Sequence, residues 1–501
     1  MRPHLLAPDV DADLSTPPLK AWADVVDDLE LNRLWDVMAD GDDIIRASVV
    51  AAMLHPLTDV ATIAYRQDAV DDALEHPDVV RAWYELAHRA ATVERGIFMM
   101  PVEGHPEMML TRDVRMLDAL ADCLEQLREE CARNAGAFTS DAFTGFCRRV
   151  ARDLSADYLA RLREQSRRLT FPDGLLMSAR LGVGGQVTDQ VLRLTRPENH
   201  RFLGHVDLKR PHVSFTLPDR DIAGAQALSE LRDRSVDEVS NAASQAVDHI
   251  VGFASTLRAE LAVLLGAVNL AAALNRIGSP ICRPAIGVTG LMTKALYDPC
   301  LALRTAQAPI PNDVAVPSGA MLVVTGSNHG GKSTLLRAIG VAHLMAQAGL
   351  FVAASTLQLH PVGRVFTHWA REEDRALRHG KLDEELTRMT TIVQTVRPGD
   401  LLLSNESFAS TNEAEGSQLA HHVMTALADG GVDVALVTHL FDLASRLDDD
   451  ARPVVFLRAP RSPDGSRSYR LEPGPPLDTS FGLDLFDQAF GTELGRGVHP
   501  C

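Results

Sequence analysis

Cysteine is scarce in this chain, and its six residues show none of the paired spacings that metal sites use. A cysteine-based zinc site is therefore not predicted, and separated thiols of this kind are typical of a protein that keeps them reduced. The first residues lack an apolar core, so a secretory leader is not expected. The most membrane-like stretch, residues 261–274, is too short for a span and contains Asn269, which favours a buried helix in a cytoplasmic protein.

Positive charge is in deficit as well. The chain carries 49 Lys and Arg residues against 67 Asp and Glu residues, a formal net charge of −18. Attraction to nucleic-acid phosphates is long-ranged and independent of sequence, so this balance excludes a protein that coats DNA with a generally basic surface. Any contact with DNA must be local.

One helical block is basic despite this balance. Residues 140–168 contain seven arginines and fewer acidic residues. The arginines are Arg148, Arg149, Arg152, Arg161, Arg163, Arg167 and Arg168. The block is either a solvated helix face or a local surface that contacts phosphates.

Helical periodicity dominates the first part of the chain, which at 501 residues is long enough for several domains. Apolar residues recur at three- and four-residue steps. This spacing predicts helices over residues 28–38, 43–54, 76–91, 113–134 and 140–168.

The pattern changes between residues 171 and 218. Short alternating runs at 175–181, 187–194 and 212–217, separated by glycines and prolines, predict the strands of a small β insert. Helical periodicity returns from residue 223 to residue 277. Two long helices that flank a β insert suggest a lever.

The most informative motif lies in the last third of the chain. Residues 326–333, Gly-Ser-Asn-His-Gly-Gly-Lys-Ser, fit the phosphate-binding pattern G-x-x-x-x-G-K-[ST]. The apolar segment 321–325 predicts a buried strand before the loop, and residues 334–339 begin a helical pattern after it. The loop therefore joins a strand to a helix, where backbone N–H groups converge on phosphates.

The loop residues have expected contacts with ATP and Mg²⁺. Lys332 would reach the β- and γ-phosphate oxygens, and the Ser333 hydroxyl would ligate Mg²⁺. The predicted nucleotide-binding residues are Gly326, Ser327, Asn328, His329, Gly330, Gly331, Lys332, Ser333 and Thr334.

Two further apolar strands end in polar residues. Residues 400–404 lead into Asn405 and Glu406, and residues 432–437 are followed closely by His439. Ligands of open α/β sheets bind at the carboxyl ends of the strands, so Glu406 is expected to act as general base and Asn405 to lie at the metal. A general base contributes ~10² to 10⁴ in rate, which favours an enzyme over a passive nucleotide binder. His439 would sense the γ-phosphate or orient the attacking water; a purely structural histidine is the alternative.

These motifs resemble those of the MutS DNA mismatch-repair ATPases. Residues 325–334 are similar to the family's T-G-P-N-M-G-G-K-S-T loop, and residues 437–443 to its A-T-H-Y-F-E-L segment. Residues 405–416 resemble the run D-E-x-x-x-x-T-x-x-x-D-G. Further similar segments are residues 54–70, 260–284, 364–367, 473–475 and 480–482.

The resemblance implies a multi-domain protein. An all-α core and lever domain over residues 1–300, with the small β insert at about 171–218, would precede an α/β P-loop ATPase domain of the ABC type over residues 301–501. In this family the ATPase domains form a head-to-tail dimer, so we expect a homodimer in which residues 410–412 approach the partner's nucleotide. ATP and Mg²⁺ are the implied cofactors. DNA is the implied partner, and a repair protein is a further candidate partner.

The chain departs from the family pattern at several positions. Asn405 replaces a metal-binding Asp, which removes a negative charge and should weaken Mg²⁺ binding. The segment 380–386 lacks the family's Ser-Thr-Phe, and no aromatic residue for the adenine base occurs near residues 310–313. Because core-like sequence begins by about residue 45, a mismatch-reading domain and a connector domain are not expected.

The leading hypothesis is a dimeric ATPase that gates a DNA clamp in mismatch repair or a related repair or recombination process, without reading mispairs itself. Its expected catalytic residues are Glu406, His439, Lys332 and Asn328. The rival is a slow nucleotide-switched scaffold for a protein or RNA partner, which Asn405 and the acidic surface favour. A transporter ATPase is less compatible, since no L-S-G-G-Q run is present.

Overall fold

The computed structural model describes residues 1–12, 14, 22–96, 105–172, 174–185, 187–193, 216–218, 220–326, 330–370, 380–460 and 467–476. The chain packs into two compact units. Met1–Pro3, Arg81–Ala137 and Thr144–Arg258 form one, here the helical unit. His4–Val80, Phe138–Phe143 and Ala259–Cys501 form the other, the sheet unit. The division at about residue 300 between a core and an ATPase domain stays a prediction.

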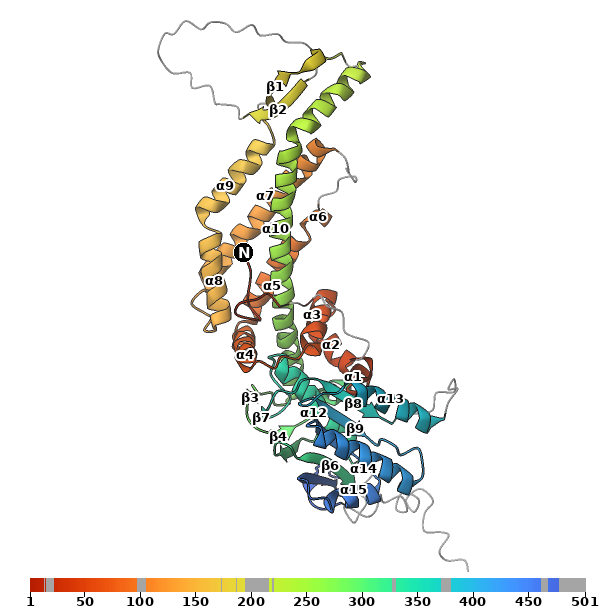
Figure 1. Ribbon diagram of the computed structural model, residues 1–501. Coiled ribbons are helices and arrows are strands. Elements are labelled where there is room, and N and C mark those ends of the chain that lie inside the picture. Colours follow the sequence, from red (N-terminus) through yellow and green to blue (C-terminus); the bar gives the residue numbers. More distant parts are fainter. Residues whose placement is uncertain are drawn as a thin grey trace, which may run out of the picture. The chain divides into compact units, whose positions relative to one another are not determined.

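Helices supply most of the helical unit (Figure 1). Its elements are α5 (Pro77–Ala91), α6 (Val93–Gly96), α7 (Pro106–Asn134), α8 (Asp141–Asp153), α9 (Ala156–Leu169), β1 (Leu176–Leu181), β2 (Val187–Arg193) and the first part of α10 (Ile222–Ile277). The helix expected over 113–134 thus begins earlier, because Pro106 is well placed in the first turn of α7.

The basic block expected as one helix forms two, α8 and α9. Ser155 separates them and adopts an extended backbone, with its hydroxyl accepting a hydrogen bond from the Tyr158 N–H at 3.2 Å. A serine in this position caps a new helix rather than continuing the old one. The helix expected over 28–38 is present as α2 (Leu31–Ala39), which begins later because Glu30, with φ +55°, separates it from the preceding helix α1 (Ala23–Asp28).

The β insert is a short antiparallel hairpin. Strands β1 and β2 pair from Leu176 opposite Arg193 to Leu181 opposite Val187. Ser235 of α10 donates a hydrogen bond to the Gln190 side chain of β2 at 3.3 Å, so the hairpin contacts the beginning of the long helix. The strand expected over 212–217 lies largely outside the described residues.

The sheet unit contains two sheets and their covering helices (Figure 1). Besides α1, α2 and the end of α10, its elements are α3 (Asp43–Leu54), α4 (Val60–Glu75), β3 (Ala285–Ile286), β4 (Leu291–Leu296), α11 (Pro299–Thr305), β5 (Asn312–Val316), β6 (Met321–Gly326), α12 (Lys332–Gln347), β7 (Thr356–Leu359), β8 (Val365–Trp369), α13 (Lys381–Thr395), β9 (Leu401–Asn405), α14 (Glu413–Asp429), β10 (Asp433–Val437), α15 (Phe441–Asp448), β11 (Val454–Ala459) and β12 (Glu472–Pro473). The strands predicted at 321–325, 400–404 and 432–437 are confirmed.

The larger sheet has the order β12-β11-β6-β10-β9-β8, and all neighbours are parallel except the β11–β12 pair at the edge. The smaller sheet has the order β3-β7-β4-β5 and mixes parallel and antiparallel pairs. The fold is therefore rich in helix with mixed sheets.

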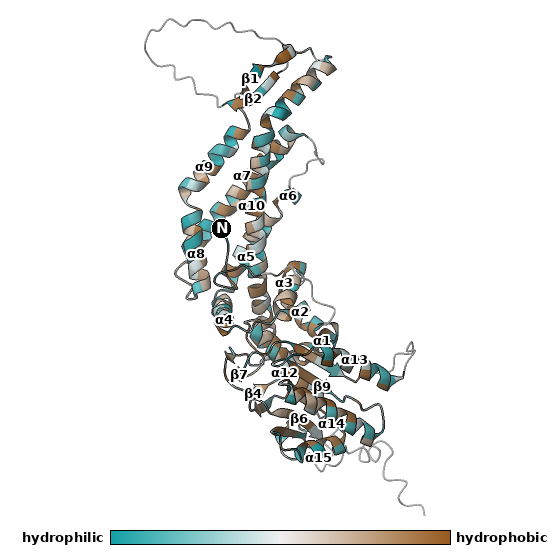
Figure 2. Cartoon of the chain, viewed as in Figure 1, coloured by the Kyte–Doolittle hydropathy of each residue, from teal (hydrophilic) through white to brown (hydrophobic). Residues whose placement is uncertain are grey.

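Both faces of the larger sheet are covered. Leu402 belongs to an apolar cluster with Met389 of α13 and Met424 of α14, whereas Leu403 approaches Gly340 of α12. Successive side chains on a strand point to opposite faces, so α12 and the α13–α14 pair lie on opposite sides. Strands buried on both faces read as continuous apolar runs, and Figure 2 shows β6 and β9 in the brown of apolar residues.

The end of α10 is buried within the sheet unit. Asn269 donates to the Met38 carbonyl oxygen at 2.9 Å, and a Cβ added to Gly266 would lie 2.5 Å from Val49. The helix is long and apolar enough to cross a membrane by composition, but 83% of its most apolar window is buried by protein. The prediction of a buried helix over 261–274 is confirmed.

Candidate nucleotide-binding site

Three strands bring the predicted site residues to one edge of the larger sheet. Val437 at the end of β10 pairs with Asn405 at the end of β9 and with Val324 near the end of β6. The segments that continue these strands carry Glu406, His439 and the glycine-rich loop. The parallel register of β6, β9 and β10 therefore places all three motifs at the same edge. The order of the motifs along the sequence does not determine this placement.

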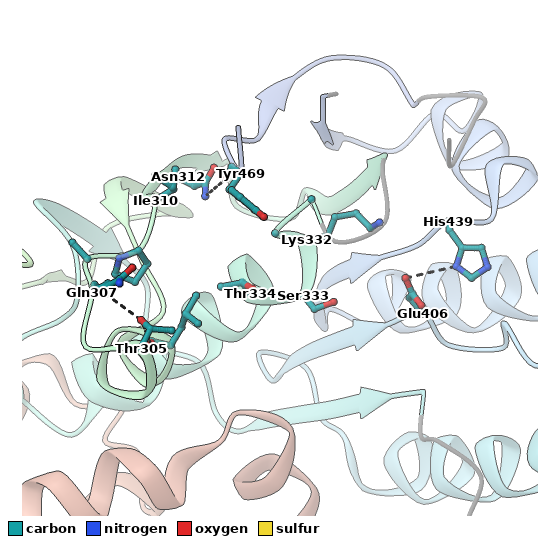
Figure 3. Close-up of a pocket in the computed structure, with 15 residues that line it drawn as sticks. Thr305, Gln307, Ile310, Asn312, Lys332, Ser333, Thr334, Glu406, His439 and Tyr469 are labelled. Atoms are coloured by element: carbon teal, nitrogen blue, oxygen red, sulfur yellow. Dashed lines mark hydrogen bonds and ion pairs between the residues drawn. The ribbon is translucent and has the colours of Figure 1, made fainter. Parts of the chain in front are cut away.

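A cavity of about 730 Å³ opens at this edge (Figure 3). Seven of the predicted site residues line it: Gly330, Gly331, Lys332, Ser333, Thr334, Glu406 and His439. The remaining lining residues are Leu301, Thr305, Gln307, Ala308, Pro309, Ile310, Asn312 and Tyr469. The cavity thus combines a polar end at the start of α12 with an apolar end at the end of α11.

Two glycines of the loop are required by the backbone. Gly326 has φ +105°, and a Cβ at this position would lie 2.6 Å from the carbonyl oxygen of Ala459 on the neighbouring strand. Gly331 has φ +90° and immediately precedes the first residue of α12. Ser327, Asn328 and His329 lie outside the described residues, so their predicted contacts stay predictions.

Lys332 is buried at the N-terminus of α12, with 4% of the residue exposed. Its ammonium group donates a hydrogen bond to the Gly326 carbonyl oxygen at 2.9 Å. Burial lowers the pKa of Lys332, and the nearby Glu406 carboxylate opposes this effect. The loop therefore holds a positive charge over its own backbone, where the phosphates of a nucleotide would lie.

Ser333 and Asn405 form the predicted metal position. The Ser333 hydroxyl donates to the Asn405 amide oxygen at 2.8 Å, so the end of β9 contacts the first turn of α12. Both are hard oxygen ligands, and Mg²⁺ commonly takes only one or two protein ligands besides phosphate oxygens and water. The pair fits Mg²⁺, although no cluster of three His, Cys, Asp or Glu side chains around a cation site occurs among the described residues.

Glu406 and His439 lie next to one another at one end of the cavity (Figure 3). Glu406 Oε1 lies 3.7 Å from His439 Nδ1, and each side chain is about one-third exposed. The interaction with the Glu406 carboxylate raises the pKa of His439, while burial opposes the rise. The pair can accept a proton from a water molecule and hold the resulting charge.

The backbone at Glu406 is unusual. Its φ is +56°, a left-handed conformation that non-glycine residues rarely adopt, and Phe408 repeats it with φ +62°. The Glu406 N–H donates to the Val437 carbonyl oxygen at 2.9 Å, which extends the β9–β10 pairing by one residue. The turn aims the carboxylate into the cavity instead of along the sheet.

Sequence reasoning missed the contribution of Tyr469. This residue lines the cavity, and its backbone carbonyl accepts a hydrogen bond from the Asn312 side chain at 3.2 Å (Figure 3). The Asn312 side chain also accepts a hydrogen bond from the Leu471 N–H at 2.7 Å. One side-chain amide therefore binds the backbone at both Tyr469 and Leu471. No spacing in the sequence connects Tyr469 with Asn312; only the fold brings them together.

Residues 410–412 do not line the cavity of their own chain. Asn412 instead caps α14, where its side chain accepts a hydrogen bond from the Glu415 N–H at 3.0 Å. Their predicted position beside a partner's nucleotide stays a prediction.

The arginines of α9 are paired with acidic residues. Arg163 contacts Asp122 and Glu125 at 2.8 and 2.6 Å, and Glu164 lies 2.8 Å from both Arg167 and Arg168. Arg161 in turn lies 3.0 Å from Asp157. These pairs support the interpretation of a solvated, salt-bridged helix face, which appears in the teal of polar residues in Figure 2.

Two family models match the chain. The model described as the MutS2 N-terminal domain matches residues 58–277, and the model described as MutS domain V matches residues 322–484. The second match begins one residue into β6 and includes Lys332, Glu406 and His439.

Curated relatives agree with these matches. A protein named DNA mismatch repair protein MutS 2 of Haloarcula marismortui is 31% identical over 232 residues, which cover 42% of this chain and 24% of the relative. Endonuclease MutS2 of Carboxydothermus hydrogenoformans is 29% identical over 241 residues, 45% of this chain and 30% of the relative. DNA mismatch repair protein MutS of Symbiobacterium thermophilum is 25% identical over 493 residues, 84% of this chain and 54% of the relative.

The chain therefore matches about half or less of the length of these relatives. Similarity nevertheless covers both halves of the chain, and the two family models account for residues on either side of the β4–β5 region. The chain belongs to the MutS family.

Proposed function

We propose that this chain is an ATPase that uses ATP hydrolysis to gate a dimeric DNA clamp in mismatch repair or a related repair or recombination process. The observation that carries the proposal is the meeting of Lys332, Ser333, Glu406 and His439 around one cavity. These four groups supply a phosphate-binding charge, a metal ligand, a base and its partner.

Each group has a task in hydrolysis. Lys332 stabilises charge on the β- and γ-phosphate oxygens, because its ammonium already lies over the loop backbone. Glu406 accepts a proton from the attacking water, and His439 at 3.7 Å orients that carboxylate. Mg²⁺, held by Ser333 and Asn405, would neutralise the phosphates when bound.

The apolar end of the cavity suits a nucleobase. Ile310 and Pro309 line it together with Tyr469, whose side chain is 48% exposed. A planar base gains about 1–3 kcal/mol by stacking on an aromatic ring. We infer that Tyr469 takes the place of the aromatic residue that is absent near residues 310–313.

A binding measurement tests the proposal directly. Lys332→Ala is expected to lower ATP affinity by about tenfold or more in calorimetry, because a charge-assisted hydrogen bond contributes roughly 1.5–3 kcal/mol. Lys294→Ala, which removes an exposed lysine from β4, is the matched control. Equal ATP affinity in all three proteins would contradict the phosphate-loop assignment.

Asn405 favours a second candidate, a nucleotide-switched scaffold with very slow turnover. An amide hydrogen-bonded to Ser333 supplies no negative charge to the metal. Such a protein would bind ATP and change its assembly state without appreciable hydrolysis. Steady-state phosphate release separates the two candidates.

A further inference from the structure

A buried carboxylate of a neighbouring helix accepts hydrogen bonds from the turn that carries Glu406. Glu385 of α13 has 3% of its surface exposed, and its Oε2 atom accepts hydrogen bonds from the Phe408 N–H at 3.0 Å and the Ser410 hydroxyl at 3.1 Å. Buried carboxylates are rare and costly, so one that accepts two hydrogen bonds from a single turn is a specific arrangement.

A second set of contacts holds the middle of the same turn. The Ser407 hydroxyl lies 2.5 Å from His368 Nδ1 and 2.6 Å from the Ser404 hydroxyl. His368 of β8 is fully buried, and its Nε2 atom lies 3.1 Å from the Glu385 carbonyl oxygen. The strand end, the turn and α13 therefore share one hydrogen-bonded network.

The turn needs this support because its backbone is strained. Glu406 and Phe408 both have positive φ, a left-handed conformation that is unfavourable for residues other than glycine. Strained conformations persist only where surrounding contacts over-determine them. Burial of the Phe408 ring beside His368, with 5.9 Å between ring centroids, adds a further restraint.

We propose that Glu385 is a positioning residue for ATP hydrolysis, holding the 406–410 turn so that the Glu406 carboxylate points into the nucleotide cavity. This inference rests on the proposed function, because it assumes that Glu406 is the general base. Glu385 does not line the cavity, so it acts only through the turn.

The inference predicts a separation between binding and turnover. Glu385→Ala removes the acceptor and is expected to lower kcat by roughly tenfold to a hundredfold, the cost of misplacing a catalytic group by about 1 Å. ATP affinity, which depends on the loop and α12, should change by less than about threefold. Glu385→Gln keeps one acceptor oxygen and is expected to retain kcat within about threefold of the parent.

Two comparisons distinguish positioning from general damage. Leu357→Ala removes buried packing from β7 of the smaller sheet, outside the apolar cluster that contains Phe408, and is expected to lower stability but keep kcat. Glu385→Ala combined with Glu406→Gln should be no slower than Glu406→Gln alone, since the first residue acts through the second.

Several outcomes would overturn the inference. They are a parental kcat in Glu385→Ala, a loss of kcat in Leu357→Ala as large as that in Glu385→Ala, or additive losses in the double variant. If Glu406→Gln itself hydrolyses ATP at the parental rate, the assignment of the base fails instead, which is a distinguishable result.

Discussion

At the scale of single residues, the proposed hydrolysis depends on Glu406 as a proton acceptor. Glu406→Gln keeps the size of the side chain but removes its basicity, so hydrolysis is expected to fall by ~10² or more while ATP stays bound. Phosphate release and ATP calorimetry measure the two effects separately. Asp429→Asn, an exposed change at the end of α14, is the control and should keep the parental rate.

A substitution of Asn405 is expected to strengthen metal binding. Asn405→Asp is expected to tighten Mg²⁺ and lower the half-saturating Mg²⁺ concentration of the ATPase, since a carboxylate binds a hard cation better than an amide does. The Ser333 hydroxyl can donate to either side chain, so the 2.8 Å contact should survive. A weaker response to Mg²⁺ would mean that the site requires the neutral amide.

The residues that sequence alone could identify are those in short motifs. Lys332, Ser333, Glu406 and His439 each follow a strand or open a helix, and the structure brings them to one cavity. Tyr469 escaped prediction because a lone tyrosine carries no periodicity and its partner is far away in the chain. The buried network around Glu385 was missed for the same reason: a glutamate in a helical pattern normally indicates a solvated face.

At the scale of secondary-structure elements, long periodic segments were predictable and their breaks were not. The helices over 43–54 and 223–277 are confirmed as α3 and α10, with bounds within a residue of those expected. The breaks at Glu30 and Ser155 depend on a left-handed residue and on a single capping hydroxyl. Such features alter local backbone geometry without altering the apolar period.

Helix α10 contains a group that should make stability depend on pH. Glu260 is fully buried and accepts hydrogen bonds from the Leu5 N–H at 2.7 Å and the Ala12 N–H at 3.2 Å. Burial is the main cause that raises the pKa of Glu260 from 4.5 to about 7, although both hydrogen bonds oppose it. Because the pKa of Glu260 is higher in the folded than in the unfolded protein, Glu260 contributes to the free energy of unfolding. This contribution is complete below pH 4.5 and is lost as the pH rises through 7.

Denaturant titrations at several pH values test this expectation. Relative to Glu260→Gln, which cannot ionise, the parent should lose roughly 3 kcal/mol of unfolding free energy between those two pH values. Asp248→Asn, an exposed change on the same helix, should keep the parental pH dependence. Parallel pH profiles for parent and Glu260→Gln would show that folding does not raise the pKa of Glu260 above its ordinary value.

At the scale of the whole molecule, the charge distribution limits how the proposed clamp could bind DNA. The net charge is −18, and the arginines of α9 already contact acidic residues. Phosphates would have to compete with these ion pairs, and phosphate contacts carry no sequence information. We therefore expect modest DNA affinity that falls steeply with salt.

Because phosphate contacts carry no sequence information, we expect little discrimination between matched and mismatched duplex. Fluorescence anisotropy at low salt should give affinities within about tenfold of each other, or ~1.4 kcal/mol. A larger preference for mismatched duplex would mean that part of the chain reads the mispair. Failure to bind any duplex, branched or single-stranded DNA would favour the scaffold for a protein or RNA partner.

The sheet unit is assembled from distant parts of the chain, and this has a consequence for synthesis on the ribosome. Arg66 of α4 donates a hydrogen bond to the Ala348 carbonyl oxygen at 3.2 Å. The Leu57 N–H donates a hydrogen bond to the Gln347 carbonyl oxygen at 3.1 Å. The first helices therefore wait until α12 has been translated, roughly 15 to 60 s at typical rates. During that interval their apolar faces are exposed, so the nascent chain is expected to require a chaperone that shields them until α12 emerges.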